Sequence, residues 1–127
     1  MILVNLIIGQ KRNLLNNLKS ISNCQNKKIK NLNFFVFWKE DKLSNEEISS
    51  INKRITNTNF IYVDKNPFKK KIIKILNKKS HPKKLRNNII SDYLQYSIVN
   101  YAFTYVSKLP NIKKICKNTY WQRIRSD

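Results

Sequence analysis

The sequence is poor in acidic residues, cysteine and histidine. The shortage of acidic residues leaves a large positive charge, and the shortages of cysteine and histidine exclude classes of site. Only 7 of its 127 residues are Asp or Glu, against 26 Lys and Arg, so the formal net charge is +19 at pH 7. Two cysteines, Cys24 and Cys116, are too few and too isolated for a disulfide framework or a zinc site. We interpret them as buried or incidental thiols in a reducing compartment. His81 is the single histidine, and no Ser-His-Asp arrangement, P-loop or metal-ligand cluster can be written from these residues.

Long apolar runs are also missing. The apolar segment at residues 1–8 is interrupted by Asn5 and followed by Gly9. It is far shorter than a signal peptide or a membrane-spanning helix requires. We therefore expect a cytoplasmic protein that forms a single α/β domain over residues 1–127, a length that can bury a modest core.

The excess of positive charge has two explanations that the sequence leaves open. A field of this sign attracts RNA, DNA, anionic lipid headgroups or a phosphorylated small molecule. Nearly all of the excess is lysine, however, and it occurs with many Asn and Ile residues. An AT-rich genome encodes lysine, asparagine and isoleucine in excess, so the second explanation is that the positive charge reflects codon usage and not a function. Arginine, which is the better phosphate ligand, occurs only five times.

Hydrophobic patterning predicts alternating strands and helices. Short β-branched or aromatic runs predict strands at residues 2–8, 34–38, 59–64 and 120–125. Apolar residues at helical spacing predict helices over about 12–22, after Ser44, after Asn66-Pro67 and over about 90–105. Ser44 and Glu47 form a capping box, the clearest helix start in the chain. This order predicts an α/β fold with a mainly parallel sheet, flanking helices and right-handed crossovers.

The stretch between the third strand and the long helix is basic throughout. Residues 65–91 contain no acidic residue. We predict a basic loop over residues 78–86, with His81 as a surface residue of that loop.

The first candidate site follows the first strand, because ligands of open α/β sheets bind at the carboxyl ends of the strands. It comprises Gly9, Gln10, Lys11 and Arg12. Gly9 is the only glycine in the chain. Such a position indicates either an ordinary strand-to-helix turn or a backbone that needs positive φ or a close approach to a ligand. Lys11 and Arg12 beside a helix N-terminus would suit a diphosphate.

Two further groups follow other strands. Glu40 and Asp41 come after the second strand, and we interpret them as a solvated loop rather than as a sugar or metal site. Alternation along the last strand places Arg123, Arg125 and Asp127 on one face, with Asp127 at the carboxyl end. That carboxylate suits a divalent cation on a nucleotide diphosphate, and the arginines suit pairing with phosphate or orienting the carboxylate. The alternative is a terminal aspartate without a role.

Taken in order, these segments resemble bacterial glycosyltransferase-like proteins of surface-polysaccharide synthesis, including those of lipopolysaccharide and capsule loci. Four short phrases carry the resemblance: Gly9-Gln10-Lys11-Arg12, Phe34-Phe35-Val36-Phe37-Trp38, a helix rich in Gln, Tyr and Ala over residues 93–103, and Arg123-Ile124-Arg125-Ser126-Asp127. The last phrase is the most specific. The similarity extends over essentially the whole chain.

The resemblance implies the nucleotide-sugar-binding half of a GT-A-type, Rossmann-like fold, truncated at its C-terminus, because the family continues into an acceptor-binding part. It implies a nucleotide-sugar donor and a saccharide or lipid-linked acceptor, with peripheral contact at the anionic inner face of the membrane. Asp127 would be the catalytic residue, as the acid that faces the metal or the sugar, and the ligand of Mg²⁺ or Mn²⁺. The family's metal motif has two acids, whereas Ser126 precedes Asp127 here. The donor would be held by Gly9, Gln10, Lys11, Arg12, Arg123 and Arg125.

A second function fits the same sequence. The net charge, the basic loop and the tyrosines interspersed along the long helix are typical of a small RNA-binding protein of the ribosomal type. Such a protein would have no catalytic role.

Overall fold

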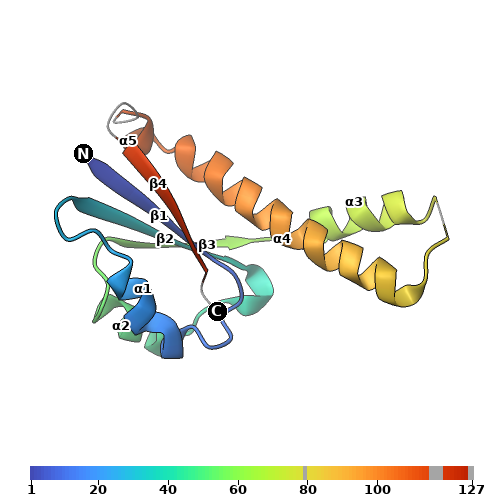
Figure 1. The fold of residues 1–127 in the computed structure, drawn as a ribbon, viewed down its shortest axis with the longest axis horizontal. Coiled ribbons are helices and arrows are strands. Elements are labelled where there is room, and N and C mark those ends of the chain that lie inside the picture. Colours follow the sequence, from blue (N-terminus) through green and yellow to red (C-terminus); the bar gives the residue numbers. More distant parts are fainter. Residues whose placement is uncertain (79, 115–118, 126–127) are drawn as a thin grey trace.

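Four parallel strands form the centre of the protein (Figure 1). The computed structural model describes residues 1–78, 80–114 and 119–125. The sheet has the order β3-β2-β1-β4, so the first strand is central and the last strand pairs with it. The predicted α/β class with a parallel sheet is confirmed. The strands are β1 (Ile2–Ile8), β2 (Lys30–Trp38), β3 (Thr58–Val63) and β4 (Thr119–Arg125).

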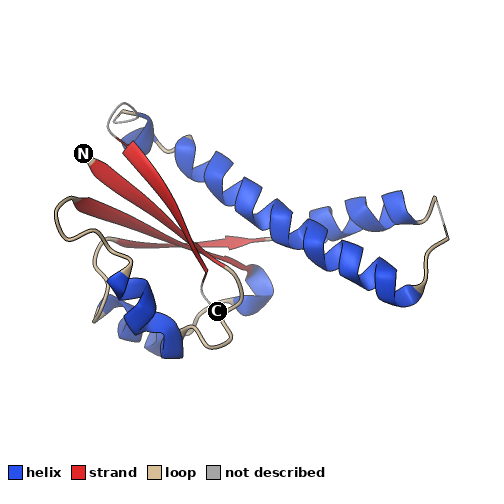
Figure 2. Cartoon of the chain, in the orientation of Figure 1, coloured by secondary structure: helices blue, strands red, loops and turns tan. Residues whose placement is uncertain are grey.

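Helices cover both faces of this sheet (Figure 2). One face carries α1 and α2, and the other carries the longest helix, α4. Among the described residues, no helix combines the length and the apolar character that crossing a bilayer requires. The α-helices are α1 (Leu18–Asn23), α2 (Asn45–Asn52), α3 (Asn66–Leu76), α4 (Lys83–Ser107) and α5 (Pro110–Lys113), and short 3-10 turns occupy Leu15–Asn17 and Lys39–Asp41.

The strands divide the core into two layers because successive side chains point to opposite faces of a sheet. Val4, Leu6 and Ile8 of β1 belong to the cluster that packs against α4. Ile7 belongs to the cluster on the side of α1 and α2, together with Phe35 of β2. Burial on both faces explains why these strands are continuous apolar runs in the sequence.

Two buried amides interrupt the apolar runs at matching positions. Asn5 of β1 and Asn33 of β2 are partners in the strand register, and both are fully buried. Asn5 Nδ2 donates a hydrogen bond to Asn33 Oδ1 at 3.0 Å, and Asn33 Nδ2 donates to the Thr56 carbonyl at 2.8 Å. A shift of register by one residue would turn both amides toward the opposite face, so this pair favours the observed alignment of β1 and β2.

The prediction of a helix over residues 12–22 is wrong at its start. Asn13 has a φ of 64°, which a right-handed helix does not accommodate. α1 begins only at Leu18 and ends at Asn23. Lys11 and Arg12 therefore lie in a turn and not beside a helix N-terminus, which removes the physical reason for placing a diphosphate on them.

One smaller prediction also needs correction, and for Cys24 the structure selects one of two alternatives. The basic loop predicted over residues 78–86 is shorter, because α4 already begins at Lys83, directly after Pro82. Cys24 is exposed, so it is an incidental thiol rather than a buried one. Cys116 lies outside the described residues.

Candidate functional site

A cavity of about 310 Å³ lies at the carboxyl edge of the sheet. Its residues come from the ends of β1 and β2, the start of α3 and one face of α4. In open parallel sheets this edge is where ligands bind, because the strand ends and the loops that follow them meet there. The cavity is lined by Gly9, Gln10, Trp38, Glu40, Asp41, Lys65, Ser91, Leu94, Gln95 and Ile98.

The contribution of α4 comes from a single face of the helix. Ser91, Leu94, Gln95 and Ile98 are spaced three and four residues apart, which places them in one row along the helix. Leu94 and Ile98 are buried against the sheet, whereas Ser91 and Gln95 are exposed. α4 therefore adds a hydroxyl and an amide to the cavity while its apolar residues fix its position on the sheet.

Lys65, Glu40 and Trp38 form a cluster in the cavity wall. Lys65 Nζ forms an ion pair with Glu40 Oε1 and lies 5.8 Å from the centre of the Trp38 ring. The Trp38 ring in turn packs against Phe68 of α3, with ring centroids 5.9 Å apart. The cluster holds a cation and a carboxylate beside an aromatic wall, and a cation in this position can attract a phosphate group.

Gly9 supplies the turn that opens the cavity. Its φ is 149°, a value in the region that favours glycine. The single glycine of the chain thus stands at a backbone position that other residues do not easily adopt, and it lines the cavity. The positive φ of Gly9 is therefore confirmed, and its close approach to a ligand stays a prediction.

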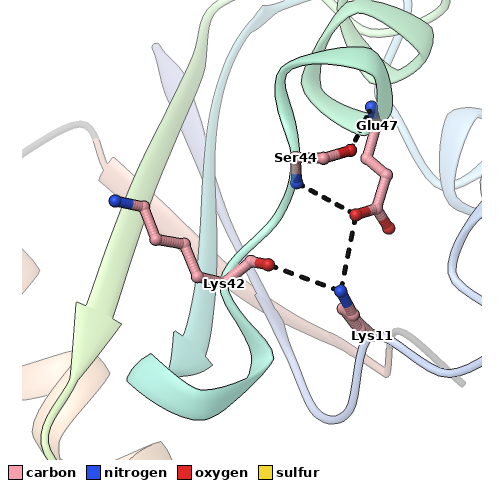
Figure 3. A network of polar contacts seen from close by, with 4 residues as sticks. All are labelled: Lys11, Lys42, Ser44 and Glu47. Carbon is pink, nitrogen blue, oxygen red and sulfur yellow. Dashed lines mark hydrogen bonds and ion pairs between the residues drawn. The ribbon is translucent and has the colours of Figure 1, made fainter.

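Lys11 does not line the cavity, and its side chain reaches Glu47 of α2 (Figure 3). Its Nζ donates to the Lys42 carbonyl at 3.4 Å and lies 3.5 Å from Glu47 Oε1. The same carboxylate accepts a hydrogen bond from the Ser44 backbone N–H at 2.9 Å, which completes the predicted capping box. Lys11 therefore ties the turn after β1 to α2. Arg12 is exposed in that turn and does not line the cavity.

The surroundings of Glu47 favour the charged form of its carboxylate. The Ser44 backbone N–H that donates to the Glu47 carboxylate lowers the pKa of this group below its ordinary value of 4.5. The Lys11 ammonium lowers the same pKa further, whereas partial burial opposes the shift. The charged form of Glu47 thus stabilises the contact between α2 and the turn.

The arginines of β4 are two residues apart on the strand and therefore lie on the same face of the sheet. Arg125 is the register partner of Ile8, so it stands level with the end of β1 and next to the Gly9 turn. Arg123 lines a different cavity, of about 410 Å³, with Trp121 and α4 residues that include Phe103. Of the predicted residues, Gly9 and Gln10 line the cavity, and Arg125 stands at the same edge of the sheet without lining it. Lys11, Arg12 and Arg123 do not line the cavity. Asp127 lies outside the described residues.

The described residues do not fit a divalent cation on their own. They contain no group of three or more His, Cys, Asp or Glu side chains that could hold a metal ion. The cavity has two carboxylates, Glu40 and Asp41, and Glu40 is already paired with Lys65. A hard cation takes several oxygen ligands, so the predicted Mg²⁺ or Mn²⁺ site would need Asp127 in addition.

Sequence reasoning missed several residues of this cavity. Glu40 and Asp41 line the cavity, a placement that their interpretation as a solvated loop does not include, although Glu40 is indeed exposed. Lys65, Ser91 and Gln95 belong to no site predicted from the sequence. The spacing of Ser91 and Gln95 relative to Leu94 and Ile98 could have identified them, because it places two polar residues beside two core residues on one helix face.

Fold and cavity together define a class of protein. A parallel sheet of order β3-β2-β1-β4 with helices on both faces is a Rossmann-like α/β architecture. No family model, curated protein or solved structure matches this chain. The ligand of the cavity is therefore inferred from its chemistry.

The backbone conformation of Gly9 generates the first prediction. Replacing Gly9 with alanine places a Cβ at a φ of 149°, and such strain costs on the order of 1–3 kcal/mol in the free energy of unfolding. Arg12→Ala, in the same turn, is the matched control and should change the free energy by less than about 0.5 kcal/mol. Urea unfolding of both variants measures the difference. Equal stability of the two variants would show that the turn does not require glycine.

The Glu47 network generates a prediction about pH. The folded-state pKa of Glu47 is lowered, so its stabilising effect is present above the ordinary value and is lost as pH falls through the folded value. At pH 7, Glu47→Gln should reduce the free energy of unfolding by about 0.5 kcal/mol. The difference from the unchanged protein should disappear in acid, below the ordinary value of 4.5.

Denaturant unfolding between pH 3 and pH 7 tests this. Glu46→Gln removes the same charge from the first turn of α2 without the Lys11 contact, and it serves as the control. A constant difference between Glu47→Gln and the unchanged protein over this range would contradict the assigned network.

Proposed function

We propose that this chain is the donor-binding part of a nucleotide-sugar-dependent glycosyltransferase of surface-polysaccharide synthesis. The observation that carries the proposal is the cavity at the carboxyl edge of the parallel sheet, where a positive-φ glycine and Lys65 line the same space. A nucleotide sugar presents an anionic diphosphate between two polar rings. The cavity offers a cation for the diphosphate and hydrogen-bonding groups for the rings.

Each group that faces the cavity would contact a different part of the nucleotide sugar. The Lys65 ammonium attracts the diphosphate, and Arg125 at the end of β4 adds a second cation at the same edge. Ser91 and Gln95 of α4 form hydrogen bonds with hydroxyl groups of the sugar or the ribose. Glu40 forms an ion pair with Lys65. When the diphosphate takes the place of this carboxylate beside Lys65, Glu40 accepts a hydrogen bond from the ligand.

In the transfer reaction the oxygen of the acceptor hydroxyl bonds to the anomeric carbon and gives up its proton to solvent. The bond between that carbon and the diphosphate oxygen breaks, and the nucleoside diphosphate leaves with its electrons. Positive charge near the leaving group stabilises this step, and Lys65 and Arg125 supply it from the described residues. A divalent cation held with Asp127 would supply further stabilisation of the same kind. The acceptor is a saccharide or a lipid-linked saccharide.

Fluorescence of Trp38 provides a direct binding measurement. The chain has two tryptophans, and Trp121→Phe leaves Trp38 as the only one, in the wall of the cavity. We expect saturable quenching by one nucleoside diphosphate out of a panel that differs in the base, and weaker quenching by the others. Lys65→Ala should weaken this binding about ten- to a hundredfold, as expected for a lost hydrogen bond to a charged group.

Lys69→Ala is the matched control. Lys69 is exposed on α3, one helical turn beyond Lys65, and it does not line the cavity. Its removal subtracts the same charge and should leave the dissociation constant within about twofold, since exposed charges at that distance are screened by salt. Equal weakening by both substitutions would mean that the ligand responds to net charge and not to this cavity.

The RNA-binding alternative makes a different prediction in the same assay. Its affinity would fall steeply with salt, with a slope set by the number of phosphates contacted. It would show no preference among the nucleoside diphosphates. Absence of saturable nucleotide quenching, together with tight salt-sensitive binding of single-stranded RNA, would replace the proposed function by this alternative.

A further inference from the structure

A pair of helices extends beyond the sheet as a basic arm, which we define as residues 65–91. Its described part contains α3 and the first turns of α4, and Figure 1 shows these two helices running away from the strands. The segment has ten lysine and arginine residues and no acidic residue. Over a third of the positive side chains of the chain are thus concentrated in this one projection.

The arm is held together by its own core. Ile72 and Leu76 of α3 are buried, and Phe68 packs against Tyr101 of α4 with ring centroids 6.4 Å apart. Arg86 of α4 donates a hydrogen bond to Asn77 Oδ1 at 2.5 Å, which joins the two helices near the distal end. The exposed side chains of the arm are therefore carried on a defined helical hairpin.

Two aliphatic side chains near the distal end are exposed to solvent. Ile75 near the end of α3 is 50% exposed, and Leu85 in the first turn of α4 is 47% exposed. Lys71, Lys74 and Lys78 lie at helical spacing around Ile75, so cations surround the first of these aliphatic groups on one face of the arm. Apolar side chains exposed among lysines are typical of segments that lie in a membrane interface.

We propose that the basic arm docks on the surface of an anionic lipid bilayer. Its lysines contact the phosphate headgroups, and Ile75 and Leu85 insert at the boundary between headgroups and acyl chains. The charges of the arm and of the bilayer are complementary, since no carboxylate of residues 65–91 opposes the approach.

The exposed residues favour a bilayer over RNA as the occupant. Single-stranded RNA is bound by aromatic side chains that stack on bases and by arginine. The distal part of the arm instead presents Ile75 and Leu85, and its single arginine, Arg86, is bonded to Asn77. Aliphatic groups gain nothing from base stacking, whereas each methylene inserted into a bilayer is favourable. Of the described residues of the arm, only Lys65 and Ser91 line the nucleotide cavity, and the proposal uses neither of them, so it does not depend on that cavity.

Vesicle flotation with the full chain tests the proposal. We expect binding to vesicles of phosphatidylcholine that contain about one third phosphatidylglycerol, and little binding to phosphatidylcholine alone. The triple variant Lys71→Gln, Lys74→Gln, Lys78→Gln should lower the vesicle partition coefficient about a hundredfold, at roughly fivefold per lysine. Lys27→Gln, Lys28→Gln, Lys30→Gln removes the same charge far from the arm and should lower it by less than about fivefold.

A second pair of variants separates lipid insertion from simple attraction of charges. The double variant Ile75→Ser, Leu85→Ser keeps every charge and should lower the partition coefficient about tenfold or more. Leu15→Ser is the control, because Leu15 is similarly exposed, at 45%, but lies away from the arm. Circular dichroism of each variant shows that the helices are retained.

Three results would overturn the proposal. The first is equal binding to neutral and anionic vesicles. The second is full vesicle binding by the Ile75→Ser, Leu85→Ser variant, which would show that no aliphatic insertion occurs. The third is absence of vesicle binding combined with RNA binding that the lysine substitutions weaken and the serine substitutions leave unchanged, which would assign the arm to RNA.

Discussion

The pairing of β1 with β2 on one side and β4 on the other is the constraint on which the rest of the structure depends. Because both neighbours run parallel to β1, all carboxyl ends reach one edge, and residues far apart in sequence meet there. Ile8 stands level with Val36 and with Arg125. The chain adds β2 and β3 on one side of β1 and then returns to add β4 on the other side, so the order of strand addition reverses at β1. The helices consequently lie on opposite faces, and the α4 face forms the wall of the cavity.

Much of this arrangement could be predicted from the sequence, because buried parallel strands appear as continuous apolar runs and capping residues mark α2. The part that failed depends on single dihedral angles and on tertiary packing. Asn13 adopts positive φ, and its polar, loop-compatible side chain did not distinguish a turn from a helix. Ser91 and Gln95 face the cavity only because α4 is held on the sheet by Leu94 and Ile98. The local spacing places these four residues on one helix face, but the edge of the sheet that this face reaches follows only from the docked helix.

The structure also shows that the lysines behind the large net charge lie in different places and have different contacts. Lys11 serves the fold, since it connects the turn after β1 with Glu47. Lys65 belongs to the cavity, where it pairs with Glu40. The lysines of α3 surround Ile75 on a helix pair that leaves the sheet. Taken together, the two proposals place a donor site at the base of an arm that contacts lipid, because Lys65 lines the cavity and immediately precedes α3. Such an arrangement suits an acceptor that is itself linked to lipid.

We infer that the carboxyl edge of the sheet forms one ligand site. A nuclear magnetic resonance titration of the isotope-labelled chain with the nucleoside diphosphate that quenches Trp38 would locate this site. We expect amide shifts to concentrate at Gly9, Gln10, Lys65, Ser91 and Gln95, which line one cavity. Shifts confined to lysines of the opposite edge, such as Lys27 and Lys30, or spread evenly over the exposed lysines, would contradict it.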